Sequence, residues 1–150
     1  MHNFIECIIL LKRRTTLFSK FFVMDSNIVS RIAITLLAIV MATFGVYHFL
    51  HPDDLLVFVP NYLPGGKLWV YIVGIAFILA AAAFISGRQV KVAGYLLAAL
   101  LFIFVLAIHL PNFLHAGDKE AQTLAFVSIL KDTAIASFAM HLGSTAGKTE

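Results

Sequence analysis

The sequence predicts an all-α integral membrane protein, a four-helix bundle with both termini in the cytoplasm. Three observations predict it. Of the 150 residues, 61% are hydrophobic and only 13% are charged. The mean hydropathy is +0.94. The apolar residues fall into four runs of about 20 residues, the length that crosses a bilayer. A soluble domain of this size cannot bury so much apolar surface.

The chain is basic, with a pI near 9.2, but nucleic acid is not an expected partner. Its Lys and Arg residues do not cluster with aromatic residues on a polar face. They fall instead where the cytoplasmic loops of a membrane protein would lie. The single cysteine, Cys7, excludes an intrachain disulfide.

Residues 1–27 are interpreted as an N-terminal extension or cytoplasmic tail. The short apolar run precedes Lys12-Arg13-Arg14, the reverse of a signal peptide, and it is too short to span. Two interpretations stay open. In the favoured one, the protein starts at Met24 and residues 1–23 are a mis-assigned upstream extension. In the other, they form an amphipathic strip on the cytoplasmic membrane surface.

Residues 28–143 are predicted to form one four-span membrane domain, and residues 144–150 a short tail. The first span should stop before Pro52 and the third at Pro111, because proline disfavours a helical residue before it. The segment 51–67 is too apolar for a solvated loop and too rich in Pro and Gly for a span, so it should be a short interfacial or re-entrant element. The predicted spans are about 29–50, 68–86, 91–110 and 121–142.

The orientation follows from the basic residues. They concentrate in the N-terminal tail, the turn at 87–91 and the C-terminal tail, whereas the opposite loops hold mostly Asp and Glu. Positive residues stay on the cytoplasmic side. Both termini should therefore be cytoplasmic, and the two Pro-containing loops should face the exterior or periplasm.

Two charges interrupt the fourth span at its middle, Lys131 and Asp132. Each costs about 2.5–3.5 kcal/mol at a helix centre, and each large apolar residue returns only about 0.3–0.6 kcal/mol. The helix therefore needs polar partners on other helices. Asp132 lies on a stripe of small residues that predicts a helix–helix seam. Adjacent residues face different directions, so Lys131 and Asp132 are not expected to bond each other.

Histidines of other spans should meet these charges. Tyr47 and His48 lie near the end of the first span, His51 follows four residues after Tyr47, and His109 lies near the end of the third. Helical rise places His48 and His109 in the outer half of the membrane, where they and Tyr47 are expected to meet Lys131. Alternatives stay open: the histidines anchor the membrane interface, or the charges only fix helix packing. Phe-rich stripes are interpreted as lipid contacts.

A metal site is not expected, because His48 and His51 lack a third ligand at a fixed spacing. Haem ligation by His48 and His109 stays a minor alternative.

With these residues placed, the chain resembles the DoxX-like family of small four-helix membrane proteins over about residues 28–142. The stretches that carry the resemblance are Gly45–Phe49 (GVYHF), Val59–Pro64 (VPNYLP), Leu68–Gly74 (LWVYIVG), Gly87-Arg88, Ile108–Asn112 (IHLPN) and Leu130–Asp132 (LKD). The family is similar to the small membrane subunit of thiosulfate:quinone oxidoreductase. The resemblance implies a quinone-linked redox role in a bacterial inner membrane.

The predicted function is a membrane subunit with a quinone-type or small-molecule pocket in the outer half of the bundle. Lys131 would polarise a carbonyl, His109 or His48 would donate protons, and Asp132 would keep the lysine charged. No covalently bound cofactor is expected, and electrons would come from a partner redox protein. Further candidate pocket and loop residues are Tyr47, His51, Asn61, Tyr62 and Asn112.

Three questions stay open from the sequence. The chain is either a subunit of a quinone-linked oxidoreductase or has no enzymatic activity. It works with a partner redox protein or as a homo-oligomer in the lipid bilayer. The alternative functions are a small-solute or proton-linked transporter component and a structural subunit for assembly.

Overall fold

A computed structural model of the chain describes residues 27–59 and 64–146, and these are helical with no strand. They include four helices long and apolar enough to cross a membrane: Asn27–Leu50, Lys67–Ser86, Val90–Leu114 and Lys119–Thr145. The prediction of four long apolar helices is thus confirmed, and the fold is consistent with a multi-pass membrane protein. The N-terminal extension and the loop residues Asn61 and Tyr62 lie outside the described residues.

The first helix is described from Asn27 to Leu50, and a second, short helix, α2 (Pro52–Leu56), follows at once. Pro52 ends one helix and opens the next because its missing N–H is harmless in a first turn. The predicted short element between the first two spans therefore contains one turn of helix. Gly65 and Gly66 then lead, both at positive φ, into α3 (Lys67–Ser86).

A tight turn joins α3 to the next helix, as predicted at 87–89. Gly87 has φ 69° and Gln89 has φ 57°. The left-handed conformation ends α3, and glycine adopts it without strain. α4 (Val90–Phe104) starts directly after Gln89.

The third span does not end at Pro111, so that prediction is wrong. α4 continues into a π-helical turn, η1 (Val105–His109), and then into α5 (Leu110–Leu114). In an α-helix the Pro111 ring would clash with the carbonyl four residues earlier. The π turn widens the helix here, with the Leu110 N–H bonded to the Val105 carbonyl. The wider turn lets the helix continue through the proline.

α6 (Lys119–Thr145) is longer than the predicted span of 121–142. Asp118 caps its first turn, because its side chain accepts a hydrogen bond from the Ala121 N–H at 2.8 Å. Such caps satisfy donors that the helix itself cannot. The predicted polar loop is correspondingly shorter.

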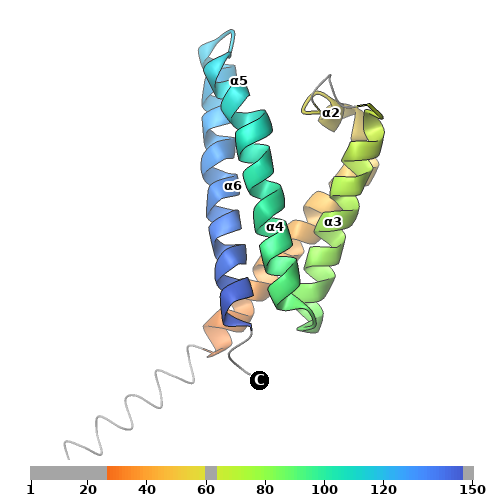
Figure 1. Cartoon of the computed structure of the whole chain (residues 1–150), viewed down its shortest axis with the longest axis vertical. Coiled ribbons are helices and arrows are strands. Elements are labelled where there is room, and N and C mark those ends of the chain that lie inside the picture. Colours follow the sequence, from red (N-terminus) through yellow and green to blue (C-terminus); the bar gives the residue numbers. More distant parts are fainter. Residues whose placement is uncertain (1–26, 60–63, 147–150) are drawn as a thin grey trace, which may run out of the picture. The chain divides into compact units, whose positions relative to one another are not determined.

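Within Leu37–Glu150, one of two units into which the chain divides, α6 packs along α4 (Figure 1). A Cβ atom on Gly94 would lie 2.6 Å from the Ala139 carbonyl oxygen and 2.9 Å from the Gly143 nitrogen. Only glycine permits this approach of two backbones. The predicted small-residue seam is confirmed by the buried residues of α6: Ala125, Asp132, Ala136, Ala139, Leu142 and Gly143.

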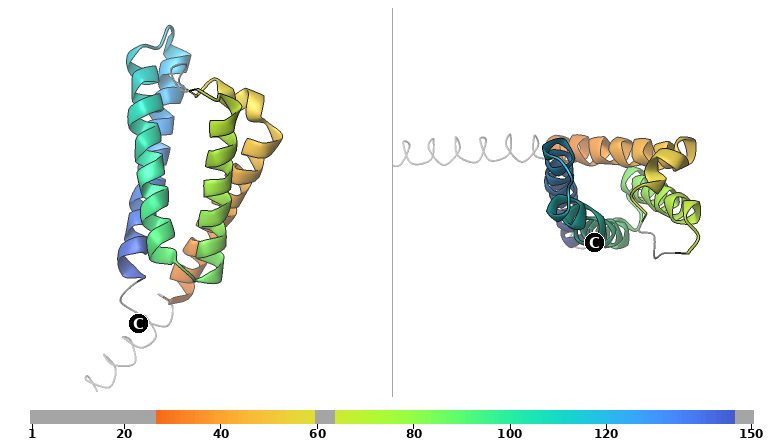
Figure 2. Two further views of the ribbon diagram at one scale, coloured as in Figure 1. Left: turned by 45° about the vertical axis from the view of Figure 1, so that its right-hand side comes forward. Right: turned by 90° about the horizontal axis from the view of Figure 1, so that it is seen from above.

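The same unit holds a second close pair, formed by residues 37–50 and α3. A Cβ atom on Gly45 would lie 2.9 Å from the Gly74 carbonyl oxygen. α3 and α4 are close at the Gly87 turn and separate toward the end that carries α2 and α5 (Figure 1), which Figure 2 shows from another side. The unit therefore consists of two helix pairs, one formed by residues 37–50 and α3 and the other by α4 and α6. The two pairs diverge from the Gly87 turn.

Candidate functional site

A cavity of about 600 Å³ lies between the two helix pairs. This volume is within the range of small-molecule sites, which are mostly apolar with a few polar groups. The cavity has this character, since its lining is largely aromatic and aliphatic. Its polar and charged lining residues are Tyr47, His48, Trp69, His109, Ser128, Lys131 and Asp132.

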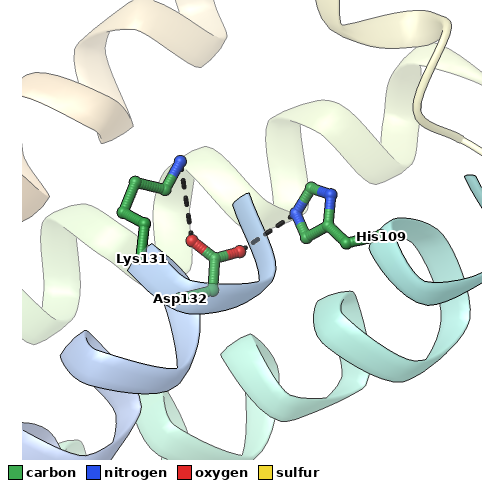
Figure 3. Close-up of polar contacts among 3 residues, drawn as sticks. All are labelled: His109, Lys131 and Asp132. Atoms are coloured by element: carbon green, nitrogen blue, oxygen red, sulfur yellow. Dashed lines mark hydrogen bonds and ion pairs between the residues drawn. The ribbon is translucent and has the colours of Figure 1, made fainter. Parts of the chain in front are cut away.

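Asp132 is the centre of a polar cluster on the cavity wall, shown in Figure 3. It is 5% exposed. His109 Nε2 donates to Asp132 Oδ2 at 3.0 Å, and Lys131 Nζ lies 3.6 Å from Asp132 Oδ1. The carboxylate therefore holds one partner on the third span and one on its own helix.

The ion pair between Lys131 and Asp132 corrects the expectation that adjacent residues would not bond. Their Cβ atoms do point in different directions, but the long lysine stem bends its ammonium back to the carboxylate (Figure 3). The expectation that Asp132 has a partner on another helix is met by His109.

The π turn explains why His109 reaches Asp132. In an uninterrupted α-helix, each residue adds about 100°, so His109 would be rotated by about 80° from the buried Leu101. The π turn contains one extra residue, which turns later residues back by about 100°. His109 then lies about two turns beyond Leu101 on nearly the same face, toward α6.

Lys131 carries its charge to the cavity. Its Nζ lies 5.3 Å from the centre of the Phe44 ring, a cation–π contact with the first helix. The lysine side chain is 45% exposed, whereas the side chain of Asp132, taken alone, is 7% exposed. The ammonium is thus held on one side by Asp132 and accessible to a ligand on the other.

The two cavity histidines each have one ring nitrogen engaged as a donor. His48 Nδ1 lies 2.7 Å from the Phe44 carbonyl oxygen, and a carbonyl can only accept. Likewise, His109 Nε2 donates to a carboxylate. In the neutral rings the second nitrogen is therefore an acceptor, and neither ring has another N–H to donate. The expectation that these histidines donate protons stays a prediction.

The cavity brings together five of the predicted site residues: Tyr47, His48, His109, Lys131 and Asp132. His51 and Asn112 do not line it. The His51 ring stacks on Tyr47 with centroids 4.6 Å apart, and its Nδ1 lies 3.4 Å from Asp54 Oδ2. Among the described residues, no three His, Cys, Asp or Glu side chains are grouped to hold a metal ion.

Sequence reasoning missed the aromatic lining. The Phe-rich stripes were interpreted mostly as lipid contacts, but Phe44, Phe58, Phe77 and Phe104 line the cavity, and Phe77 is only 4% exposed. Phe44 could have been found, because it lies one helical turn before His48. Trp69 also lines the cavity, and its Nε1 donates to the Pro64 carbonyl at 2.8 Å.

The chain belongs to a family described as a domain of unknown function, DUF8561, which matches residues 37–142. The match includes all the lining residues of the cavity. No curated protein and no solved structure matches the chain.

Proposed function

We propose that this chain is a DoxX-like membrane subunit that binds a quinone-type molecule in the cavity and serves a redox complex. The observation that carries the proposal is the Lys131–Asp132–His109 cluster on the wall of an otherwise apolar cavity of about 600 Å³. Intramembrane charges of this kind mark functional sites by default. A partner redox protein would exchange electrons with the bound quinone.

The charge of the cluster favours a neutral ligand. The Lys131 ammonium and the Asp132 carboxylate form an ion pair in which the two charges cancel. A carboxylate or phosphate ligand would bring an unbalanced charge into an apolar cavity, which is strongly unfavourable. A quinone is neutral, and its flat ring matches the aromatic lining.

The polar groups also match quinone oxygens. A carbonyl oxygen needs a hydrogen-bond donor, and the Lys131 ammonium is a donor with an accessible side. Tyr47 lines the same cavity, and a tyrosine hydroxyl can donate as well. The rest of the wall is largely apolar, and a hydrogen bond in apolar surroundings is stronger than one in water.

Binding can be measured through Trp69, the only tryptophan of the chain, because it lines the cavity. We expect a short-chain quinone to quench its fluorescence saturably in detergent. Lys131→Met should weaken binding about tenfold, since a hydrogen bond to a charged group contributes about 1.5–3 kcal/mol and partial exposure reduces this. A tryptophan derivative in the same micelles corrects for absorption by the quinone.

Lys119→Met is the matched control, because Lys119 begins the same helix and is exposed. It should bind as the unaltered protein does. The proposal is wrong if folded Lys131→Met protein binds the quinone as tightly as the unaltered protein.

We further propose a bacterial inner membrane with both termini in the cytoplasm, supported by the basic residues near the termini and the Gly87 turn. In a Cys7→Ser background, Gly117→Cys on intact cells should react with a membrane-impermeant maleimide. Gln89→Cys should react only after the cells are permeabilised. The opposite pattern would refute this orientation.

A further inference from the structure

The hydrogen bond that His48 makes determines which of its ring nitrogens donates and which accepts. Its Nδ1 donates to the Phe44 carbonyl at 2.7 Å. That bond leaves Nε2, the nitrogen farther from the backbone, as the acceptor of the neutral ring. None of the described residues bonds Nε2. His48 lines the cavity, so a ligand that reaches Nε2 either presents a donor to this nitrogen or leaves it unpaired.

In the second cavity histidine, His109, one ring nitrogen is likewise engaged as a donor. His109 gives its Nε2–H to Asp132, and its Nδ1 is turned away from the carboxylate (Figure 3). Lys131 is the complementary group, because an ammonium can only donate. The polar wall thus combines imidazole acceptors with one strong donor.

A quinone carbonyl has no hydrogen to donate, so it can pair with Lys131 but would set its lone pairs against His48 Nε2. A hydroquinone satisfies both groups, because one hydroxyl can donate to the imidazole and the oxygen of the other can accept from the ammonium. An unpaired buried acceptor costs about 1–3 kcal/mol.

We propose that the cavity binds the reduced, hydroquinone form more tightly than the oxidised quinone, with His48 Nε2 accepting from a ligand hydroxyl. The inference rests on the proposed function, since it selects between two forms of the same ligand. It makes His48 the residue that determines this selectivity. The preference should be about tenfold, the equivalent of one hydrogen bond.

A potentiometric titration of a short-chain naphthoquinone tests this inference, with and without an excess of the purified full-length protein. Tighter binding of the hydroquinone raises the midpoint potential of the bound couple. A tenfold preference corresponds to about 30 mV for two electrons. We expect this rise with the unaltered protein and its loss with His48→Phe, which keeps a ring beside Phe77.

His51→Phe is the control, because His51 directly follows the helix that carries His48 but does not line the cavity. It should keep the rise in potential. If His48→Phe does not fold, His48→Leu replaces it, with folding checked by circular dichroism and gel filtration.

Each result has a distinct meaning. An unchanged or lowered midpoint, together with saturable Trp69 quenching, overturns the hydroquinone preference and leaves quinone binding in place. A rise that persists in both His48 variants overturns the role of His48. If neither form quenches Trp69, the proposed function and this inference both fail.

Discussion

Gly94→Val is expected to destabilise the protein more than any other single change within the helices. A Cβ atom at this position would lie 2.6 Å from the Ala139 carbonyl oxygen, and the obstacle is backbone, not a flexible side chain. α4 and α6 would have to separate along their seam. Overpacking costs about 1–3 kcal/mol, and we expect the upper part of this range.

The matched control for Gly94→Val is Ala99→Val, in the same helix but exposed. Thermal unfolding in detergent, followed by circular dichroism, should show a large loss for the first variant and a small change for the second. Equal effects of the two variants would refute the α4–α6 contact as the cause, since helix propensity alone favours valine over glycine and disfavours it against alanine.

Asp132→Ala is expected to have the second largest effect, a loss of about 2 kcal/mol. Hydrogen bonds between membrane helices contribute about 0.6 kcal/mol on average and about 1.7 at most. Lys131 adds less than its distance suggests, because its side chain is 45% exposed. Asp132→Asn should lose less, because the amide oxygen can still accept from His109. Unfolding in detergent measures both variants.

Replacing the whole charge pair separates stability from function. The double variant Lys131→Met, Asp132→Leu should lose less stability than Asp132→Ala, since it leaves no unpaired ammonium and fills the space of the carboxylate, although His109 still loses its acceptor. It should nevertheless no longer bind quinone, as measured by Trp69 fluorescence. Full function of this double variant in cells would instead indicate an assembly subunit whose charges are dispensable.

The long helices were predictable from the sequence because their cause is local. Apolar runs and basic flanks define the spans, and the spacing of small residues placed Asp132 in a seam. The prediction that the first helix ends before Pro52 was also correct, because that proline follows the end of an apolar run. Pro111 has the same local signal but a different structure, since the π turn before it relieves the clash.

The site was only partly predictable, for physical reasons. Phenylalanine is equally compatible with lipid and with an apolar cavity, so Phe77 gave no signal of its burial. The pairing of Lys131 with Asp132 depends on how a long side chain bends, which helical spacing does not describe. The direction of the histidine hydrogen bonds depends on backbone carbonyls, which are absent from side-chain patterns.

The wide turn at Val105–His109 also bears on how members of the family should be compared. A relative with one residue fewer in this stretch could form an unbroken α-helix and still aim its histidine at the same carboxylate. Its histidine would then fall one column away from His109 in an alignment made by counting residues. Equivalent imidazoles are therefore to be identified by the direction they face from the helix axis, not by their number in the chain.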